Sequence, residues 1–537
     1  MYMYMLTHVH VENSMQFTSC TAVLCTAGNP ILESIKFVAS RRPAGESGGA
    51  RMRSSSWWLQ SLLLCSPITA VAFQRRVFLH YLPWYSVDSR TDSEPPRQGW
   101  CEAGGGELCR DTANRQYVGD GPFIGEYDQR DAAVLENHAL LAAAAGIDVI
   151  LMNLNPQSAQ QVQIFRHMAD VLFSLRSHHG SRFNVSLALS YDNSYATTSG
   201  AIAADALTIS SLLSYARGFN VTFLATSEES ANGAGSHEVV FVWSEHDPEL
   251  DVFDTIRAAL TDGTLLLARN AVNFAAADGN FLWLKPMVDG ETSSREAPPE
   301  AYWGEMYLID SEWLMTNDQG SLPVAERNTL LVASAYPGFD DRKVPASWNG
   351  GKPRLIARNT TAGNTYDRTW ERALDFQPHR YGTEVTLQQP WVQIITWNDW
   401  PEGTAIEPTT TMEAFAATAV YSRRWKGHAF AEPDEIAGVH SAMRTAVHVA
   451  AAILGARRVA DSRSDGGTIE DAIKLFLDGA FESAASRLDL SGQGSGLQLA
   501  SPGAGLYFGP NRECALTLNS GPPARLQSSC AIVHGDG

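Results

Sequence analysis

The sequence predicts an α/β protein built on a (β/α)8 (TIM) barrel, with a small C-terminal helical extension and an irregular tail. From residue 76 to residue 425, short apolar runs alternate with helical patterns. The runs are nearly continuously apolar, which is typical of parallel strands covered by helices. Their number, about eight or nine, favours a closed barrel over an open doubly wound sheet. No Gly-x-Gly-x-x-Gly follows the first run, which argues against a dinucleotide-binding fold.

The expected strands are β-branched and aromatic runs that end in polar or Gly-containing turns. They are residues 77–81, 147–152, 185–191, 239–243, 265–268, 281–284, 306–309, 330–333 and 392–396. A helix is expected at residues 132–145, because this Ala- and Leu-rich stretch ends at Gly146, as a C-cap would. Further helices are expected near residues 158–176 and, as the last helix of the barrel, at residues 412–425.

The C-terminal part continues with two amphipathic helical patterns, at residues 434–457 and 468–487. Thr468 and Asp471 predict a variant capping box at the start of the second pattern. The remainder is rich in Gly, Ser and Pro and is expected to be irregular. We therefore expect a barrel at residues 73–430, a helical extension at 431–490 and a tail at 491–537, preceded by an extension at 1–51 and a signal peptide at 52–72.

The expected signal peptide, residues 52–72, has a basic start, a short apolar core and the small-x-small ending Ala70-Val71-Ala72. Residues 1–51 show no helical or strand period, and we expect translation to begin at Met52 and this extension to be non-native. A signal anchor is the alternative. Polar residues and Pro67 interrupt the apolar stretch, however, so it would span a membrane poorly. After cleavage, we expect no membrane association.

Composition narrows the classes of partner. Hydrophobic residues make up 44% and charged residues 18% of the chain, which is ordinary for a globular protein with a core. The net charge of -19 argues against binding to nucleic acid, which needs clustered Lys and Arg. Neutral partners such as sugars fit this charge better. We expect a monomer.

Cysteines and glycosylation signals point to an oxidising compartment. Beyond the signal peptide the cysteines are Cys101, Cys109, Cys514 and Cys530. An even set fits disulfide formation, and pairing of sequence neighbours suggests Cys101–Cys109 and Cys514–Cys530, although other pairings remain open. Three N-glycosylation sequons begin at Asn184, Asn220 and Asn359. We therefore expect a secreted glycoprotein, or one that resides in the lumen of the Golgi or the ER.

The segment Trp397-Asn398-Asp399-Trp400-Pro401-Glu402-Gly403-Thr404 directly follows an apolar run and carries the strongest functional signal. Asp399 and Glu402 lie just beyond a strand end, where parallel α/β folds place their chemistry. Paired carboxylates beside aromatic rings suit glycoside hydrolysis, which needs an acid, a base or nucleophile, and flat apolar surfaces. The alternative is a strand-end loop with solvated acids and Trp residues that belong to the core.

Other acidic and aromatic residues follow expected strands and can line a cleft for an oligo- or polysaccharide. The candidate substrate-binding residues are Tyr81, Trp84, Tyr85, Asp192, Trp243, Glu245, Asp340, Trp397, Asn398 and Trp400. Any one of them alone is more often a helix cap or a core residue. Glu245-His246-Asp247 lacks the spacing of an EF-hand or a zincin, so we expect neither a metal nor a cofactor. A Gly-x-Ser-x-Gly motif is missing, which argues against a Ser-His-Asp hydrolase.

Several segments, taken in order, resemble glycoside hydrolase family 99, the endo-α-mannosidases and endo-α-mannanases, and the related family 71 α-1,3-glucanases. They are Tyr81-Leu82-Pro83-Trp84-Tyr85, Gly125 to Asp131, Ala145-Gly146-Ile147-Asp148, Tyr336 to Asp341, and Trp397 to Pro408. The resemblance covers about residues 76–425. It implies a (β/α)8 barrel and an endo-acting enzyme that retains anomeric configuration, with Asp399 and Glu402 as its catalytic pair.

The sequence departs from the family 99 motif at two positions. Asp399 stands where the family has Glu, and Pro401 replaces a His. Because an error of about 1 Å can cost on the order of 100-fold in rate, Asp is not automatically equivalent to Glu. Family 71 has Asp at this position, which fits a different sugar. A family of polysaccharide-biosynthesis proteins shares similar motifs, so a glycosyltransferase is an alternative, as is a carbohydrate-binding pseudoenzyme.

Overall fold

The computed structural model describes much of the chain between residues 74 and 490. The described residues are 74–86, 100, 121–226 without 195 and 197, 236–243, 252–284 without 262 and 270–276, 330–341, 354–375 without 361 and 362, 380–381, 385–386, 388–460 and 466–490, with strands at 20–26, 29–35, 514–516 and 528–530. The chain divides into two units, Met1–Thr69 and Ala70–Gly537. The predicted signal peptide, the expected strand at 306–309, Cys101, Cys109 and Glu245 lie outside the described residues.

Two antiparallel strand pairs lie towards the ends of the chain. In the first unit, β1 (Cys20–Thr26) pairs with β2 (Asn29–Ile35), in a stretch whose sequence shows no strand period. In the second unit, β18 (Cys514–Leu516) pairs with β19 (Ser528–Cys530). Their register places Cys514 opposite Cys530, and the disulfide between these residues stays a prediction.

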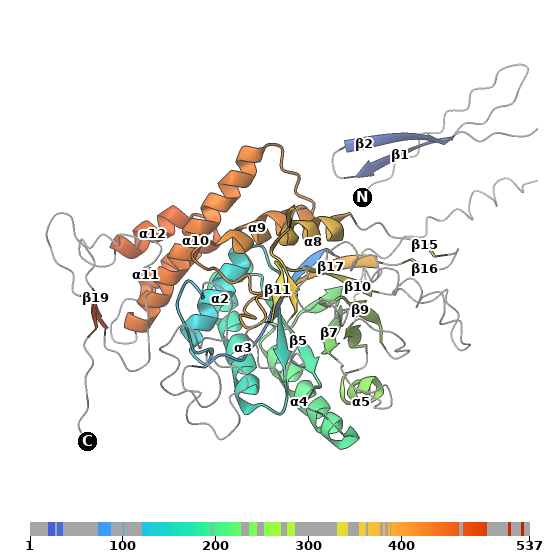
Figure 1. Cartoon of the computed structure of the whole chain (residues 1–537), viewed down its shortest axis with the longest axis horizontal. Helices are drawn as coiled ribbons and strands as arrows, with labels where there is room; N and C mark the ends of the chain where they lie inside the picture. Colours follow the sequence, from blue (N-terminus) through green and yellow to red (C-terminus); the bar gives the residue numbers. More distant parts are fainter. Residues whose placement is uncertain are drawn as a thin grey trace, which may run out of the picture. The chain divides into compact units, whose positions relative to one another are not determined.

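A nine-stranded sheet forms the centre of the second unit (Figure 1). Its strands are β3 (Arg76–Tyr81), β4 (Val149–Leu154), β5 (Ser186–Asp192), β6 (Leu224–Thr226), β7 (Ser236–Trp243), β8 (Leu265–Arg269), β9 (Gly279–Phe281), β10 (Leu330–Ala335) and β17 (Gln388–Ile394). They run in the order β5-β4-β3-β17-β10-β9-β8-β7-β6, and only β6 is antiparallel to its neighbour.

The sheet curls, because β5 pairs in parallel with β7 as well as with β4. This curled parallel sheet confirms the predicted α/β class. The expected strand at 281–284 was placed too late, since β9 ends at Phe281. Most residues between β9 and β10 lie outside the described part of the chain, so the complete set of βα units stays a prediction.

Alternating side chains fill the two faces of the sheet. On β3, Phe78 lies in a buried cluster with Phe241 and Trp391, at ring-centroid distances of 5.4 and 5.5 Å. Its neighbours Val77 and Leu79 belong to the other large cluster, which contains the buried faces of the helices. Because successive residues of a strand point to opposite faces, an apolar strand can serve an inner core and a helix-facing core at once.

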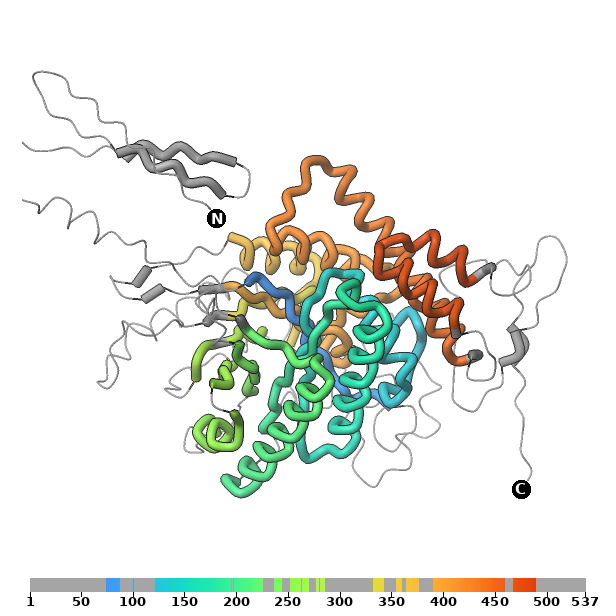
Figure 2. Tube along the Cα trace, turned by 180° about the vertical axis from the view of Figure 1, so that it is seen from behind, coloured from blue at the N-terminus to red at the C-terminus, as the bar shows by residue number. Residues whose placement is uncertain are grey.

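Helices cover the outer face of the sheet (Figure 2). They are α2 (Ala132–Ala144), α3 (Ala159–His179), α4 (Ser199–Gly218), α5 (Val252–Ala259), α8 (Thr365–Leu374) and α9 (Glu413–Trp425). Side-chain caps define several starts: Asp131 accepts from the backbone N–H of Ala133, and Asn364 from that of Tyr366. The expected helices at 132–145 and 412–425 are confirmed, and Gly146 adopts φ +73° after α2.

The C-terminal helical extension consists of α10 (Pro433–Ala460), α11 (Gly466–Leu477) and α12 (Phe481–Leu490). The single helix expected at 468–487 was wrong, because the chain breaks into α11 and α12. Gly479 has φ +76°, and the N–H groups of Gly479 and Ala480 bond the carbonyls of Phe476 and Leu475, which ends α11 as a Schellman motif does.

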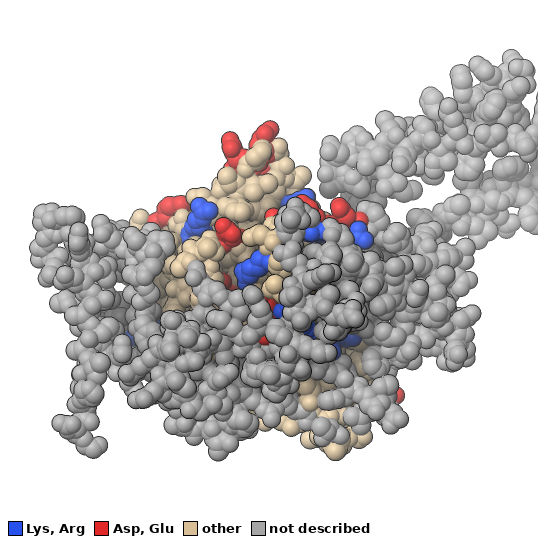
Figure 3. All heavy atoms as spheres, in the orientation of Figure 1, with Lys and Arg blue, Asp and Glu red and all other residues tan. Residues whose placement is uncertain are grey.

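Charged residues of both signs lie on the described part of the face that Figure 3 shows. Figure 3 shows acidic side chains at the start of α10, whose first turn carries Asp434 and Glu435, and mixed acidic and basic side chains elsewhere on this face. Among the described helices, none is both long and apolar enough to cross a membrane.

Candidate active site

The segment from Trp397 to Glu407 leaves the carboxyl end of β17 and is tied to the end of its parallel neighbour β3. The Trp397 N–H donates to the carbonyl of His80 at 2.7 Å. The Asn398 amide bonds both backbone groups of Leu82, each at 2.9 Å. The segment therefore lies at the carboxyl edge of the parallel sheet, where folds of this class carry their sites.

Asp399 and Glu402 belong to one tight turn within this segment. The Thr404 N–H donates to the Asp399 carbonyl at 3.2 Å, and the Thr396 N–H donates to the Thr404 carbonyl at 3.1 Å. Gly403 has φ +64°, which a residue with a side chain rarely adopts. The turn thus requires the Gly of the motif and fixes the backbone between the two carboxylates.

Asp399 is a buried carboxylate, with 4% of its surface exposed. Its Oδ1 accepts from the Glu402 N–H at 3.1 Å, and its own N–H donates to the Thr396 hydroxyl at 2.8 Å. Burial raises the pKa of Asp399 to about 7, and the Glu402 N–H offsets part of this effect. Near neutral pH, this carboxyl therefore exists in both protonation states.

Glu402 is half-buried, and its backbone connects the turn to Asp340. The Asp340 N–H donates to the Glu402 carbonyl at 2.7 Å. Asp340 is 8% exposed and lies on β11 (Phe339–Asp340), which pairs with β12 (Leu355–Ile356). The structure thus brings Asp340 beside the Asp399–Glu402 turn, as the sequence predicts for residues that follow strand ends.

The aromatic residues of the motif are packed into the core. Trp397 and Tyr81 are fully buried, Trp400 is 2% exposed and Tyr85 is 1% exposed. Tyr85 stacks on Trp100 at a centroid distance of 4.4 Å, and its hydroxyl accepts from the Trp400 N–H at 3.3 Å. These rings pack against the Asp399–Glu402 turn on its buried side, and their contact with sugar stays a prediction.

A second aromatic group lies at the ends of β3, β7 and β9. Trp243 and Trp283 meet edge to face at 4.2 Å, and His80 contacts Trp283 at 4.6 Å. The Arg269 guanidinium lies 4.0 Å from the centre of a Trp243 ring. Burial lowers the pKa of His80 to about 3, so this ring is neutral, although the Gln393 side chain slightly opposes the effect.

The remaining predicted site residues are spread around the same edge. Asp192 ends β5, is half-buried and is the register partner of Trp243 on β7. Trp84 is half-buried just after β3. The Asn398 amide, predicted to bind substrate, is fully buried and is engaged with the Leu82 backbone.

The sequence-based prediction named Tyr81 but missed the buried polar cluster that Tyr81 forms with Glu407, His138 and Tyr127 next to the turn. The Tyr127 hydroxyl donates to Glu407 Oε2 at 2.7 Å, and His138 Nε2 lies 3.1 Å from Oε1. His138 Nδ1 lies 2.9 Å from the Tyr81 hydroxyl. The only signal in the sequence is that Glu407 and Tyr127 fall inside the resembling segments, since a contact between residues 138 and 407 has no local pattern.

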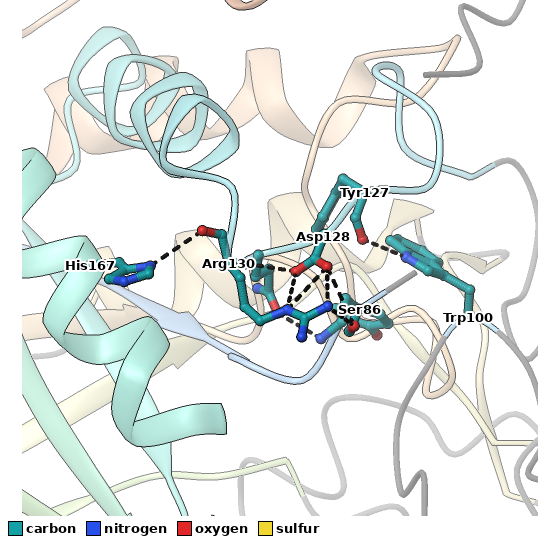
Figure 4. Close-up of polar contacts among 8 residues, drawn as sticks. Ser86, Trp100, Tyr127, Asp128, Arg130 and His167 are labelled. Carbon is teal, nitrogen blue, oxygen red and sulfur yellow. Dashed lines mark hydrogen bonds and ion pairs between the residues drawn. The ribbon is translucent and has the colours of Figure 1, made fainter. Parts of the chain in front are cut away.

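The segment before α2 carries a second polar cluster (Figure 4). The Arg130 side chain points toward Ser86 and Asp128, with an ion pair to Asp128 at 2.6 Å and a hydrogen bond to the Ser86 hydroxyl at 2.9 Å. The Trp100 indole donates to the Tyr127 carbonyl at 2.8 Å. This cluster joins the segment to the end of β3 beside the Asp399–Glu402 turn.

Metal-ligating side chains do not converge in the part of the chain that the structure describes. No group of three or more His, Cys, Asp or Glu residues there could hold a metal ion.

Comparisons with known proteins yield likenesses in structure only. No family model and no curated protein matches the sequence. A GH99 endo-α-mannosidase from Bacteroides thetaiotaomicron matches at a TM-score of 0.42 and 13% identity, over 67% of this chain and 100% of that one. The same enzyme in complex with bis-tris propane matches at 0.41 and 13%, over 69% and 100%. These values describe a distant likeness of fold.

Proposed function

We propose that this chain is a retaining, endo-acting α-glycosidase that hydrolyses internal α-linkages of a mannan- or glucan-type glycan. The observation that carries the proposal is the turn at the end of β17, which holds a buried Asp399 with a pKa of about 7 three residues before Glu402. A carboxyl whose pKa lies near the working pH can both accept and return a proton in one catalytic cycle. The distant likeness to glycoside hydrolases agrees with this but carries none of the argument.

Asp399 serves in this proposal as the base that assists the substrate itself. In a mannan-type substrate the 2-hydroxyl is trans to the leaving oxygen, so the ionised form of Asp399 takes the proton of that hydroxyl while its oxygen attacks the anomeric carbon, which forms a 1,2-anhydro sugar. When water later opens this ring at the anomeric carbon, Asp399 returns the proton to the 2-oxygen. Two inversions leave the configuration retained.

Glu402 serves as the acid and then the base. It donates its proton to the leaving glycosidic oxygen in the first step and takes one from the attacking water in the second, so protons balance over the cycle. Its half-buried position suits a group that must reach substrate and water. The buried rings of Trp400 and Tyr85 hold its turn from below.

The fold that we propose around this site is a complete (β/α)8 barrel. The parallel pairing of β5 with β7 supports it, because β5 is the first strand of the sheet and β7 is next to the last, so this contact joins the two ends of the curled sheet. The carboxyl ends of its strands then surround a single site, to which Asp192, Trp243 and Asp340 contribute.

A second candidate function, a carbohydrate-binding protein with weak or no turnover, is favoured by one observation. Asp399 is 4% exposed and one methylene shorter than the Glu of the family motif. A carboxylate that cannot reach the 2-hydroxyl would bind sugar without turning it over.

The test is a comparison of Glu402→Gln on two substrates. On a natural α-glycan the variant should lose at least about 100-fold in kcat while it retains ligand affinity, because Gln cannot donate a proton. On an activated aryl α-glycoside, the cleavage step should suffer less, because the leaving group needs little acid assistance.

Glu413→Gln is the matched control, since Glu413 is an exposed carboxylate at the start of α9. It should behave as wild type on both substrates. Wild-type turnover of the natural glycan by Glu402→Gln would exclude Glu402 as the acid. Saturable glycan binding without turnover by the unaltered protein would support the binding function instead.

A further inference from the structure

Glu407 is a buried carboxylate that the proposed reaction does not use. Its side chain is 2% exposed and lies beneath the turn that carries Asp399 and Glu402. Oε2 accepts from the Tyr127 hydroxyl at 2.7 Å and from the Trp400 indole N–H at 3.3 Å, and Oε1 lies 3.1 Å from His138 Nε2. The Glu407 carboxylate thus contacts His138 on α2, Tyr127 in the segment before α2 and Trp400 in the turn.

The acceptor capacity of the Glu407 carboxylate determines which groups of this cluster donate. An ionised carboxylate offers only acceptors, so Tyr127, Trp400 and His138 Nε2 must each donate to it. With the proton on Nε2, His138 Nδ1 is free to accept, and it lies 2.9 Å from the Tyr81 hydroxyl. Burial above all, and also the charge of Glu407, raises the pKa of both Tyr81 and Tyr127, so the two phenols keep the protons that they donate.

The cluster is connected to the reacting groups through Trp400, which lies between Asp399 and Glu402 in the chain. The Trp400 indole bonds Glu407, and the Trp400 backbone N–H bonds the Tyr85 hydroxyl. The Glu407 N–H in turn donates to the Trp397 carbonyl at 2.8 Å, which closes the segment on itself. Glu407 therefore binds the Trp400 side chain through its carboxylate and the Trp397 backbone through its N–H group.

We propose that Glu407 is a positioning residue, which fixes Trp400 from below and thereby aims the carboxylates of Asp399 and Glu402. His138 and Tyr81 hold Glu407 in the orientation that receives the indole proton. The proposal rests on the function proposed above, because it assigns Glu407 a role in the same reaction. A buried charge is costly to keep, and aliphatic residues would fill this space at lower cost if packing were its only role.

The test compares Glu407→Ala with Glu407→Gln. In Glu407→Ala the Trp400 indole loses its acceptor. The carboxylates of Asp399 and Glu402 should then be misplaced by about 1 Å, which should lower kcat on the order of 100-fold and change KM by less than about threefold. Gln keeps the acceptor for Tyr127 and Trp400, while its NH₂ donates to His138 Nε2 in the other tautomer. Glu407→Gln should therefore restore kcat to within about tenfold of wild type.

Two further variants separate positioning from stability. Trp400→Phe removes the indole donor together with part of the buried ring, and combining it with Glu407→Ala should cost less than the sum of the two single effects, because both variants break the same hydrogen bond. Glu238→Gln is the control, since Glu238 is a buried carboxylate that pairs with Arg217 far along the chain from the turn. It should leave kcat per folded molecule unchanged.

The indole N–H resonance of Trp400 gives a readout that does not depend on turnover. Assigned by its loss in Trp400→Phe, this resonance should move in Glu407→Ala and stay near its wild-type position in Glu407→Gln. An unmoved resonance in Glu407→Ala, or full kcat in that variant, would overturn the positioning role. Lack of hydrolysis by the wild type would instead contradict the proposed function, and the indole resonance would still decide whether Glu407 holds Trp400.

Discussion

Burial and hydrogen bonding act in opposite directions on Asp399. Burial disfavours its charge and raises the pKa to about 7, whereas the Glu402 N–H favours the charge. The folded state therefore prefers the protonated carboxyl between the usual pKa of 3.8 and about 7. Stability from this preference is fully present below pH of about 4 and is lost as the pH rises through about 7.

We predict that Asp399→Asn stabilises the protein in a pH-dependent manner. Asn keeps the acceptor for the Glu402 N–H but carries no charge, so it avoids the cost of ionising a buried group. The gain in free energy of unfolding should be near zero at about pH 4 and reach on the order of 2–4 kcal/mol above about pH 7. Chemical denaturation of both proteins across this range measures it, and a gain independent of pH would exclude the raised pKa.

Which site residues a sequence can reveal depends on whether their signal is local. The position of Asp399 and Glu402 in one turn after a strand could be predicted, because their spacing, the preceding strand and Gly403 lie in one short segment. The contact between Glu407 and His138 could not, since it depends on how α2 packs against the segment that follows β17. The sequence could not decide whether Trp397 and Trp400 lie in the core or contact sugar, because an indole that follows a strand suits either position.

At the scale of elements, α10 supports the site from outside the sheet. Its Leu454 belongs to the buried cluster of Tyr85, Trp100, Tyr127 and Trp400. Near the same end of α10, Arg458 forms an ion pair at 2.8 Å with Asp131, the N-cap of α2. The helical extension therefore packs against the residues that support the Asp399–Glu402 turn.

We predict that Leu454→Ala lowers both stability and activity. The lost packing and the remaining cavity should cost about 2–5 kcal/mol in the free energy of unfolding, and loosened support of Trp400 should lower kcat. Ile453→Ala is the matched control, because this neighbour is equally buried but packs in the helix-facing core. A similar loss of stability with unchanged kcat is expected there, and equal kcat in both variants would contradict the role of α10.

Local patterns predicted elements well where the apolar period was long. The helices at 132–145 and 412–425 were found almost residue for residue. The break at Gly479 was missed because the apolar period continues across it, although Asp478-Gly479 is a turn signal. The antiparallel β6 was also missed, since three residues are too few to form a period.

At the scale of the whole molecule, the structure shows whether the asparagines of the three sequons are exposed to solvent. Asn184, Asn220 and Asn359 are all exposed in the described structure, as an acceptor of N-glycans must be. With the expected signal peptide, this supports our proposal that the protein works in the secretory pathway.

We predict that protein from a eukaryotic secretory host carries N-glycans at these positions. Treatment with an N-glycanase should reduce its mass, and the triple substitution of the three asparagines by Gln should abolish that change. Efficient secretion of an unglycosylated protein would contradict this placement of the sequons.

The central claim is hydrolysis of an internal α-glycosidic bond with retention, and proton NMR of the first product tests it most directly. Purified protein is mixed with α-mannan or α-1,3-glucan oligosaccharides, and the anomeric signals of the new reducing end are followed from the first minutes. We predict that the α anomer forms first and then mutarotates, and that Asp399→Asn and Glu402→Gln produce little of either. Initial release of the β anomer, or glycosyl transfer seen only with a sugar-nucleotide donor, would contradict the account.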